Sequence, residues 1–208
     1  MNELSNTKEL ILDVFIEMTS ALGYENVSMR GIAEKVGIKA ASIYNYFESK
    51  GKILEHVYDY YLEHQYDNRK PVPEMHTLIE TAGARDIVTT FFYTFQTEDQ
   101  RKYRRMILTT KIVYMRLFQD PIANKIFTDA NINNAEYVQA VLQHGINIGR
   151  IDPTFDLPTF AEILIGSLQI MGIKAFASVA YQVGQLDQEQ RILDLLARLL
   201  STALNPSA

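Results

Sequence analysis

Apolar residues recur at intervals of three and four along most of this chain, and that interval matches one face of an α-helix. Between residues 6 and 22 the recurring positions are Leu10, Ile11, Val14, Phe15, Met18 and Leu22, and Gly23 follows as a helix stop. Only residues 87–95 (IVTTFFYTF) are β-prone, and the length and neighbours of that stretch favour a helix. The pattern therefore predicts an all-α protein.

Three more amphipathic segments follow the first one. Ser28 is placed to cap a short helix, which Gly37 ends. A second helix is expected from about residue 40 to 47, and Ser49 can cap a longer third helix. The residues expected to face inward are Ile32, Ala33, Val36, Ile43, Phe47, Ile53, Leu54, Val57, Tyr61 and Leu62. The two short helices, separated by Gly-Ile-Lys, form a helix-turn-helix.

The segment 67–77 (DNRKPVPEMHT) interrupts this pattern with two prolines and a run of charges, which is typical of a linker. We therefore expect two helical domains, residues 1–66 and residues 67–208. Later helix starts are indicated by capping residues, namely Thr97 with Gln100, Asp120 with Pro121, and Asp187 with Gln190. Residues 149–158 are expected to form a loop.

The charge distribution suits a small surface for a polyanion, although the whole chain carries a net charge of −5. Between residues 28 and 52, five lysines and arginines stand against two glutamates. Lys35 and Lys52 are interpreted as solvated charges, while Arg30 is balanced between solvation and a phosphate or groove contact. The candidate DNA-binding residues are Ser28, Arg30, Lys39, Ala40, Ala41, Ser42, Tyr44, Asn45, Tyr46 and Lys50.

The second helix of the motif carries the side chains that a DNA groove would meet. A helix fits the major groove of B-DNA, with its N-terminal residues at the base edges. Ala40 and Ala41 permit close approach there. Tyr44 and Tyr46 are rigid arms whose hydroxyl groups reach phosphates. Lys50 begins the next helix, so its charge and the helix N-terminus can hold the same phosphate backbone.

Residues 28–54 (SMRGIAEKVGIKAASIYNYFESKGKIL) resemble the DNA-binding domain of the TetR family of bacterial transcriptional regulators. The shared pattern consists of Ile32-Ala33, Gly37-Ile38, Ile43-Tyr44, Tyr46-Phe47, Lys50 and Leu54. The chain departs from the family at Lys39, where a serine usually caps the recognition helix, at Ala41, where glycine is common, and at Gly51, where glutamate is usual. A lysine cannot cap a helix, although it can reach a phosphate or a guanine.

The resemblance implies an N-terminal three-helix helix-turn-helix DNA-binding domain followed by a helical effector-binding and dimerisation domain. The expected function is a ligand-responsive transcriptional regulator, a repressor that a small apolar or aromatic molecule releases from a palindromic double-stranded DNA operator. The resemblance also implies a homodimer through the two C-terminal helices, expected at 157–182 and 189–204. Its seam candidates, which also fit an internal core, are Leu164, Leu168, Met171, Leu195, Leu196, Leu199 and Leu200.

Large, soft side chains are frequent in the middle of the chain. Each one is more often core than ligand pocket, but as a group they suit an apolar or aromatic effector. The candidate ligand-binding residues are Phe91, Phe95, Met106, Thr110, Tyr114, Phe118, His144, Asn147 and Gln169. The basic run RKYRR (101–105) is interpreted as a solvated face, with an anionic ligand or a DNA contact as the alternatives.

The residues present in the chain argue against several other classes of protein. The chain has no cysteine, its four histidines show no metal-ligand spacing, and no nucleophile or phosphate-loop motif occurs, so we expect no metal, no cofactor and no enzyme. The N-terminus has no secretion-signal layout and the apolar stretch 163–173 is too short for a bilayer, so we expect no membrane partner and a cytoplasmic location. The alternative to a regulator is a ligand-independent protein-interaction adaptor on the same scaffold.

Overall fold

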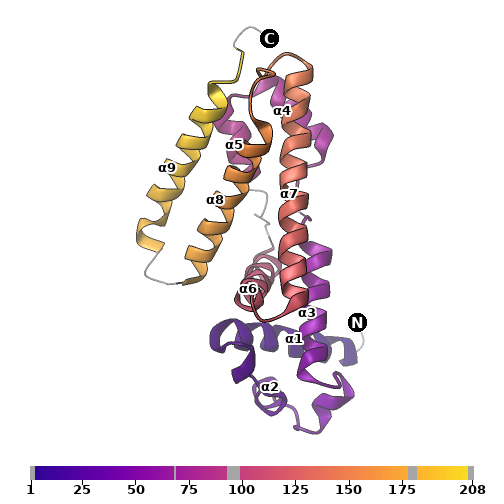
Figure 1. The fold of residues 1–208 in the computed structure, drawn as a ribbon. Coiled ribbons are helices and arrows are strands. Elements are labelled where there is room, and N and C mark those ends of the chain that lie inside the picture. The colour runs from indigo at the N-terminus through magenta and orange to yellow at the C-terminus, as the bar shows by residue number, and fades with distance from the viewer. Residues whose placement is uncertain (1–2, 68, 93–98, 178–181, 206–208) are drawn as a thin grey trace. The chain divides into compact units, whose positions relative to one another are not determined.

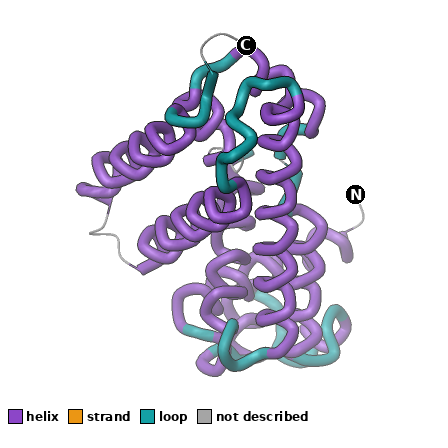
Figure 2. The backbone as a smooth tube through the Cα atoms, turned by 45° about the horizontal axis from the view of Figure 1, so that its top comes forward, coloured by secondary structure: helices purple, strands orange, loops and turns teal. Residues whose placement is uncertain are grey.

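The computed structural model describes residues 3–67, 69–92, 99–177 and 182–205 (Figure 1). These residues form helices and connecting loops without a β-sheet, so the predicted all-α class is confirmed (Figure 2). The helices are α1 (Glu3–Leu22), α2 (Met29–Val36), α3 (Lys50–His64), α4 (Val72–Thr81), α5 (Ala84–Phe92), α6 (Gln100–Arg116), α7 (Pro121–Asn147), α8 (Leu157–Ala177) and α9 (Gln182–Ser201). Two 3₁₀ turns, η1 (Tyr24–Asn26) and η2 (Ser42–Asn45), complete the described elements. None of the described helices is long and apolar enough to span a membrane.

The predicted helix boundaries in the N-terminal third are confirmed at their caps. The Ser28 hydroxyl accepts a hydrogen bond from the Gly31 N–H at 3.1 Å, and the Ser49 hydroxyl accepts one from the Lys52 N–H at 3.2 Å. Gly37 ends α2 with a φ of 84°, a left-handed conformation that a residue with a Cβ rarely adopts. Local sequence signals therefore determine where these helices begin and end.

The helix predicted at residues 40–47 is longer than the structure shows. The chain forms only the short 3₁₀ turn η2 there, and no side chain caps its start. The Lys39 side chain has no hydrogen-bond acceptor, and the Lys39 backbone carbonyl instead accepts the Ser42 N–H at 2.8 Å. Ile43 and Phe47 are nevertheless buried as predicted, so the segment keeps its inward face without a full helix.

Three other boundaries differ from the sequence prediction. The linker expected at 67–77 gives way to α4, because a proline in the first helical turn costs no intrahelical hydrogen bond. The last helix begins at Gln182, ahead of the predicted cap at Asp187. Asp99 caps α6, while Thr97, the predicted start of the capping box, lies outside the described residues. The cap at Asp120 is confirmed, since its carboxylate accepts the Ile122 N–H at 2.9 Å.

The described chain divides into two compact units. The first comprises residues 1–67 and 97–127, and the second comprises residues 68–96 and 128–208. The first unit is larger than the predicted domain 1–66 because α6 and the start of α7 contribute buried residues to its core. That core contains Ile11, Leu12, Val14, Phe15, Ile16, Val27, Ile32, Ala33, Ile43, Phe47, Ile53, Leu54, Val57, Tyr58, Ile112, Val113, Ala123 and Ile126. The functional boundary at residues 66 and 67 stays a prediction.

The second unit buries a separate apolar core between α4, α5, α7, α8 and α9. Ile151, in the turn after α7, is fully buried and packs over Gly145 of that helix. The Arg150 guanidinium donates to the carbonyls of Ala82 at 3.0 Å and Asn205 at 3.4 Å. The turn after α7 thereby ties the end of α4 to the C-terminal segment.

Candidate nucleic-acid interface

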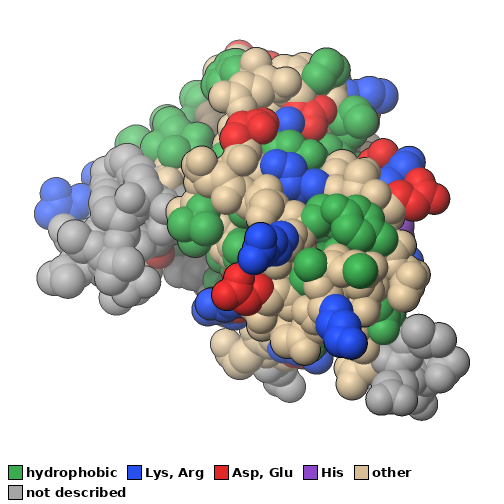
Figure 3. Space-filling model, turned by 90° about the horizontal axis from the view of Figure 1, so that it is seen from below, with side chains coloured by type: hydrophobic (Ala, Val, Ile, Leu, Met, Phe, Trp, Pro, Cys, Tyr) green, Lys and Arg blue, Asp and Glu red, His purple; other side chains and the backbone are tan. Residues whose placement is uncertain are grey.

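The helix-turn-helix leaves most of its predicted DNA-binding side chains in solvent. Tyr44 is 56 % exposed, and Ser42, Tyr46 and Lys50 are half-buried. The remaining predicted residues, all exposed, are Ser28, Arg30, Lys39, Ala40, Ala41 and Asn45. Figure 3, which looks from below onto this face, shows Lys and Arg side chains, and some acidic ones, spaced among apolar and uncharged surface. The arrangement presents hydrogen-bonding and cationic groups together, as a polyanion surface requires.

The underside of the motif is held by apolar packing. Ile32, Ala33 and Ile43 are fully buried, and Phe47 is nearly so. The Ala33 carbonyl accepts the N–H groups of both Gly37 and Ile38, at 3.0 Å and 2.9 Å, which closes the end of α2. Because α2 and η2 share this buried layer, the exposed residues between them keep a fixed position on the unit.

Lys50, which the sequence suggested as a phosphate contact, also has contacts within the protein. Its ammonium donates to the Tyr24 carbonyl at 2.8 Å and lies 4.0 Å from the centroid of the Tyr24 ring. Lys52, by contrast, forms an exposed ion pair with Glu55 at 2.7 Å, consistent with the solvated charge that was expected. Tyr24 is therefore a residue of this site that sequence reasoning missed.

A second aromatic and ionic cluster joins the same tyrosine to α6. The guanidinium carbon of Arg116 lies 4.2 Å from the Tyr24 ring centroid. The Nε of Arg116 lies 3.3 Å from the Asp120 carboxylate, which also accepts the Tyr58 hydroxyl at 2.8 Å. Burial opposes ionisation of Asp120, but hydrogen bonds from Tyr58, the Ile122 N–H and Arg116 hold the pKa of Asp120 below its ordinary value.

The basic run at the start of α6 pairs with acidic side chains of α1. Arg101 donates to Asp13 at 2.6 Å, and Arg104 donates to Glu17 at 3.2 Å. Arg105 is only 12 % exposed and bonds to Asp13 at 2.6 Å and to Glu9 at 2.8 Å. The solvated-face interpretation therefore holds for the exposed Arg101 and Arg104, but it is wrong for Arg105, which the acids of α1 hold in place.

Comparison with protein families identifies this motif. Residues 11–57 match the model of the bacterial regulatory proteins of the tetR family. The chain carries a TetR-family DNA-binding domain. The match covers α1 from Ile11 onward, η1, α2, η2 and the first half of α3, so it includes every predicted DNA-binding residue. No curated protein matches the chain.

Solved structures share the fold of this chain over nearly its whole length. A TetR transcriptional regulator from Chloroflexus aurantiacus is 19% identical, covers 98% of both chains, and has a TM-score of 0.68. GusR from Salmonella enterica is 17% identical, with 96% of this chain and 98% of its own covered at a TM-score of 0.59. SmeT, solved as a triclosan complex, is 13% identical, with 97% and 93% covered at a TM-score of 0.64. At such identities the likeness shows the fold.

The predicted effector-binding residues divide between the two units. Met106, Thr110 and Tyr114 are half-buried and follow one another at four-residue intervals, so they share a face of α6. Burial raises the pKa of Tyr114 to about 12, and its ring packs edge-on against Phe127 at 5.2 Å. Phe118 is 92 % exposed because α6 ends at Arg116, which takes Phe118 off that face.

The remaining effector candidates among the described residues lie in the second unit and already have protein neighbours. Phe91 is 4 % exposed and belongs to the apolar core, which favours the core interpretation. His144 stacks on His76 with ring centroids 3.9 Å apart. Asn147 accepts from Gln143, and Gln169 donates to Asn131. Phe95 lies outside the described residues. Among the described residues no cluster of acidic and histidine side chains is arranged to hold a metal ion.

The seam candidates on α8 and α9 separate into buried and exposed groups. Leu164, Leu196 and Leu200 are buried in the second unit, so they are internal core. Leu195 and Leu199 are exposed, at 58 % and 39 %, while Leu168 and Met171 are half-buried. Three exposed isoleucines on α8 were not among the predicted seam residues, namely Ile163, Ile170 and Ile173. Their intervals of seven and three place them on one helix face, a signal that was available in the sequence.

Proposed function

We propose that this protein is a dimeric, ligand-responsive transcriptional regulator that represses from a palindromic operator and is released by a small apolar or aromatic molecule. The observation that carries the proposal is the exposed face of the helix-turn-helix in a TetR-family domain. Tyr44, Asn45 and Lys39 stay in solvent there while Ile43 and Phe47 anchor the segment from beneath. Such a face offers groups for base edges and for phosphates at once.

Dimer formation is supported by the apolar side chains that α8 and α9 leave in solvent. Ile163, Ile170, Ile173, Leu195 and Leu199 are each at least 39 % exposed. Exposed apolar groups on neighbouring helices are typical of a surface that a second copy covers. A two-fold dimer would place two recognition segments about 34–36 Å apart, one turn of B-DNA, and would explain a palindromic operator.

An apolar effector is supported by the soft, half-buried face of α6 that includes Met106, Thr110 and Tyr114. SmeT, which shares the fold, was solved with triclosan, a small aromatic molecule. In this proposal the effector favours a dimer geometry in which the recognition segments no longer fit adjacent major grooves.

The decisive experiment is a mobility-shift titration of the purified protein against DNA upstream of its own gene, followed by selection and sequencing of bound fragments. We expect one palindromic sequence to emerge, with a complex that a subset of an apolar and aromatic ligand panel dissociates. A stable complex that no ligand in the panel affects would favour a ligand-independent regulator. Failure to select any sequence would favour a protein-interaction adaptor on the same scaffold.

Single substitutions test the roles of the exposed residues. Tyr44→Phe is expected to weaken binding to all sequences alike, because the hydroxyl is proposed to contact a phosphate. Lys39→Ala is expected to change the selected sequence, because this lysine can reach a base edge. Lys70→Ala, which alters an exposed lysine of the second unit, is the control and should leave both properties unchanged. An unchanged preference in Lys39→Ala would assign that lysine to the phosphate backbone.

A further inference from the structure

One aromatic ring in the first unit is shared by two cations with different surroundings. The Tyr24 ring centroid lies 4.0 Å from the Lys50 ammonium and 4.2 Å from the Arg116 guanidinium carbon. Lys50 begins α3 beside the helix-turn-helix, whereas Arg116 ends α6. A cation over an aromatic ring is attracted to it, more strongly where water is excluded. Tyr24 thus connects a predicted DNA-contacting lysine to the last turn of α6.

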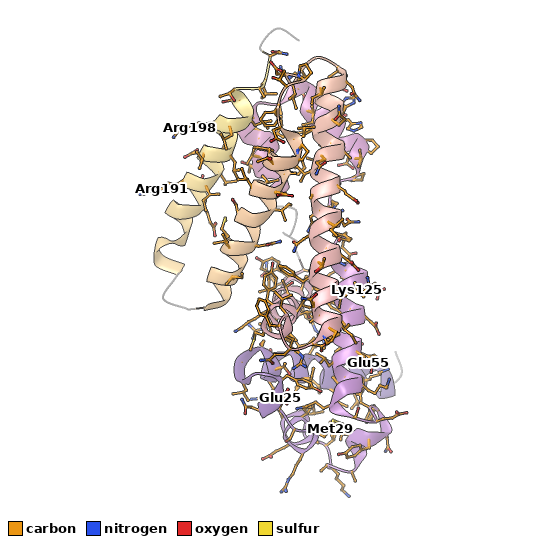
Figure 4. All side chains as sticks on the ribbon, viewed as in Figure 1. Glu25, Met29, Glu55, Lys125, Arg191 and Arg198 are labelled. Carbon is orange, nitrogen blue, oxygen red and sulfur yellow. The ribbon has the colours of Figure 1, made fainter. Side chains whose placement is uncertain are left out.

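Arg116 is fixed by partners that leave it little access to DNA. Its side chain is 13 % exposed, and its Nε and Nη1 lie 3.3 Å from Asp120 and 3.5 Å from Glu25. Asp120 is itself held by the Tyr58 hydroxyl at 2.8 Å. Figure 4 places Glu25 next to α1, at the segment that leads into α2. An arginine held from three sides orients its neighbours rather than reaching for a ligand of its own.

Lys50 depends on the position of Tyr24 in two ways. Its ammonium donates to the Tyr24 carbonyl at 2.8 Å and lies over the ring of the same residue. An ammonium group has three N–H donors, so one bond to a carbonyl leaves two for a phosphate. Holding a flexible lysine in one place before binding avoids much of the entropy that ordering it in the complex would cost.

We infer that Arg116 is a positioning residue that holds Tyr24, and through Tyr24 orients Lys50 for a phosphate of the operator. This inference rests on the proposed function, because it requires Lys50 to contact DNA. It goes beyond that function because it assigns a role in operator affinity to the last turn of α6. A change at this turn then alters affinity by releasing Tyr24 and Lys50, without moving the buried layer beneath η2.

The test is a double-mutant cycle of operator affinity at fixed salt, with Arg116→Met and Lys50→Met made singly and together. We expect Arg116→Met to weaken binding about tenfold in the wild-type background and less than twofold when Lys50 is already Met. Arg116→Lys, which keeps a cation near Tyr24, should retain affinity within about threefold. The slope of log affinity against log salt should fall by about 0.9 in Arg116→Met, the value for one lost phosphate contact.

The outcomes separate this inference from the proposed function. If Arg116→Met weakens binding equally in both backgrounds and leaves the salt slope unchanged, the residue is merely structural and the inference is wrong. Tyr24→Leu tests the same link from its other end, and it decides the case should Arg116→Met not fold. A dependence of its effect on Lys50 supports the inference, while independence overturns it. If the wild-type protein selects no DNA sequence, the proposed function fails first and the inference falls with it.

Discussion

The two compact units are built on different balances of polar and apolar contacts. In the first unit, charged side chains bridge helices, as Arg101, Arg104 and Arg105 of α6 do with the acids of α1. The second unit also has an interhelical ion pair, between Arg85 of α5 and Asp194 of α9, but it differs in that isoleucines and leucines of α8 and α9 remain in solvent. Figure 4 shows Arg191 and Arg198 on the outer side of α9.

The difference between the units follows from what each surface is proposed to meet. A face that binds a polyanion must hold its polar groups in fixed places, and interhelical ion pairs supply fixed geometry at modest cost. A face that binds a second copy needs apolar area that water leaves on association. In this proposal, DNA recognition by the first unit depends on individual polar residues. Self-association of the second unit depends on the total apolar area of an exposed helix face.

The largest expected effect comes from placing a charge on the exposed apolar face of α8. Ile170→Glu should weaken self-association at least about 100-fold, because the carboxylate would lose water at the centre of the proposed interface. Sedimentation analysis over a range of concentrations measures it, and circular dichroism checks that the helices remain. Ile132→Glu on α7 is the matched control, since Ile132 is equally exposed at 54 %. Equal self-association of the two variants would mean that this face of α8 is not the interface.

The next effect concerns packing within the second unit. A Cβ on Gly145 would lie 2.6 Å from Cδ1 and 2.8 Å from Cγ1 of the buried Ile151. Gly145→Ala should therefore lower the free energy of unfolding by about 2 kcal/mol, even after the better helix propensity of alanine is counted. Gly166→Ala is the control, because a Cβ there meets nothing within 4 Å. Denaturant unfolding measures both. If Gly145→Ala gained as much stability as Gly166→Ala, Ile151 would have moved aside without cost.

Sequence reasoning succeeded where a local signal determined the structure. Ser28, Gly37 and Ser49 correctly predicted helix boundaries. The pattern also predicted that Ile43 and Phe47 are buried beneath the helix-turn-helix. It failed where the deciding contact is distant in the chain. Nothing near Tyr24 indicates that Arg116 lies against its ring, and nothing in RKYRR indicates that α1 supplies the partners.

The exposed apolar face of the second unit marks a different limit of sequence reasoning. Leu196 and Leu195 are adjacent, equally apolar, and yet buried and exposed respectively. A helix that is apolar on two faces has one face for its own core and one for another partner. The sequence identifies both faces but cannot assign them, because the assignment depends on where the neighbouring helices of the unit pack.

A smaller expected effect is the difference in stability loss when a buried or an exposed arginine of the α1–α6 contact is replaced. Arg105→Ala should lower stability by about 1–2 kcal/mol, since it leaves the Asp13 and Glu9 carboxylates without their shielded partner. Arg104→Ala should change stability by less than about 0.5 kcal/mol, because the Arg104 side chain is 68% exposed. Thermal unfolding at low and high salt measures both, and added salt should reduce only the difference at Arg104. Equal losses would mean that burial adds nothing to these pairs.

The smallest expected effect is a pH dependence of the stability of the first unit that is caused by Asp120. Its pKa is lowered in the folded state, so the unfolded chain binds the proton more readily and folding is favoured while the carboxylate is ionised. That contribution is complete above the ordinary aspartate pKa of about 4 and is lost as pH falls through the lowered folded value.

Asp120→Asn should therefore cost about 1 kcal/mol near neutral pH, where it weakens a charge-assisted bond from Tyr58, and almost nothing in strong acid. The measurement is the free energy of unfolding in denaturant across the acid range. Asp152→Asn is the matched variant in the second unit, where Thr154 hydrogen bonds lower the pKa of an exposed carboxyl. Because water already solvates Asp152, its curve should follow wild type more closely. If the two variants gave the same pH profile, the ionised Asp120 carboxylate would contribute no more to the free energy of unfolding than the ionised Asp152 carboxylate does.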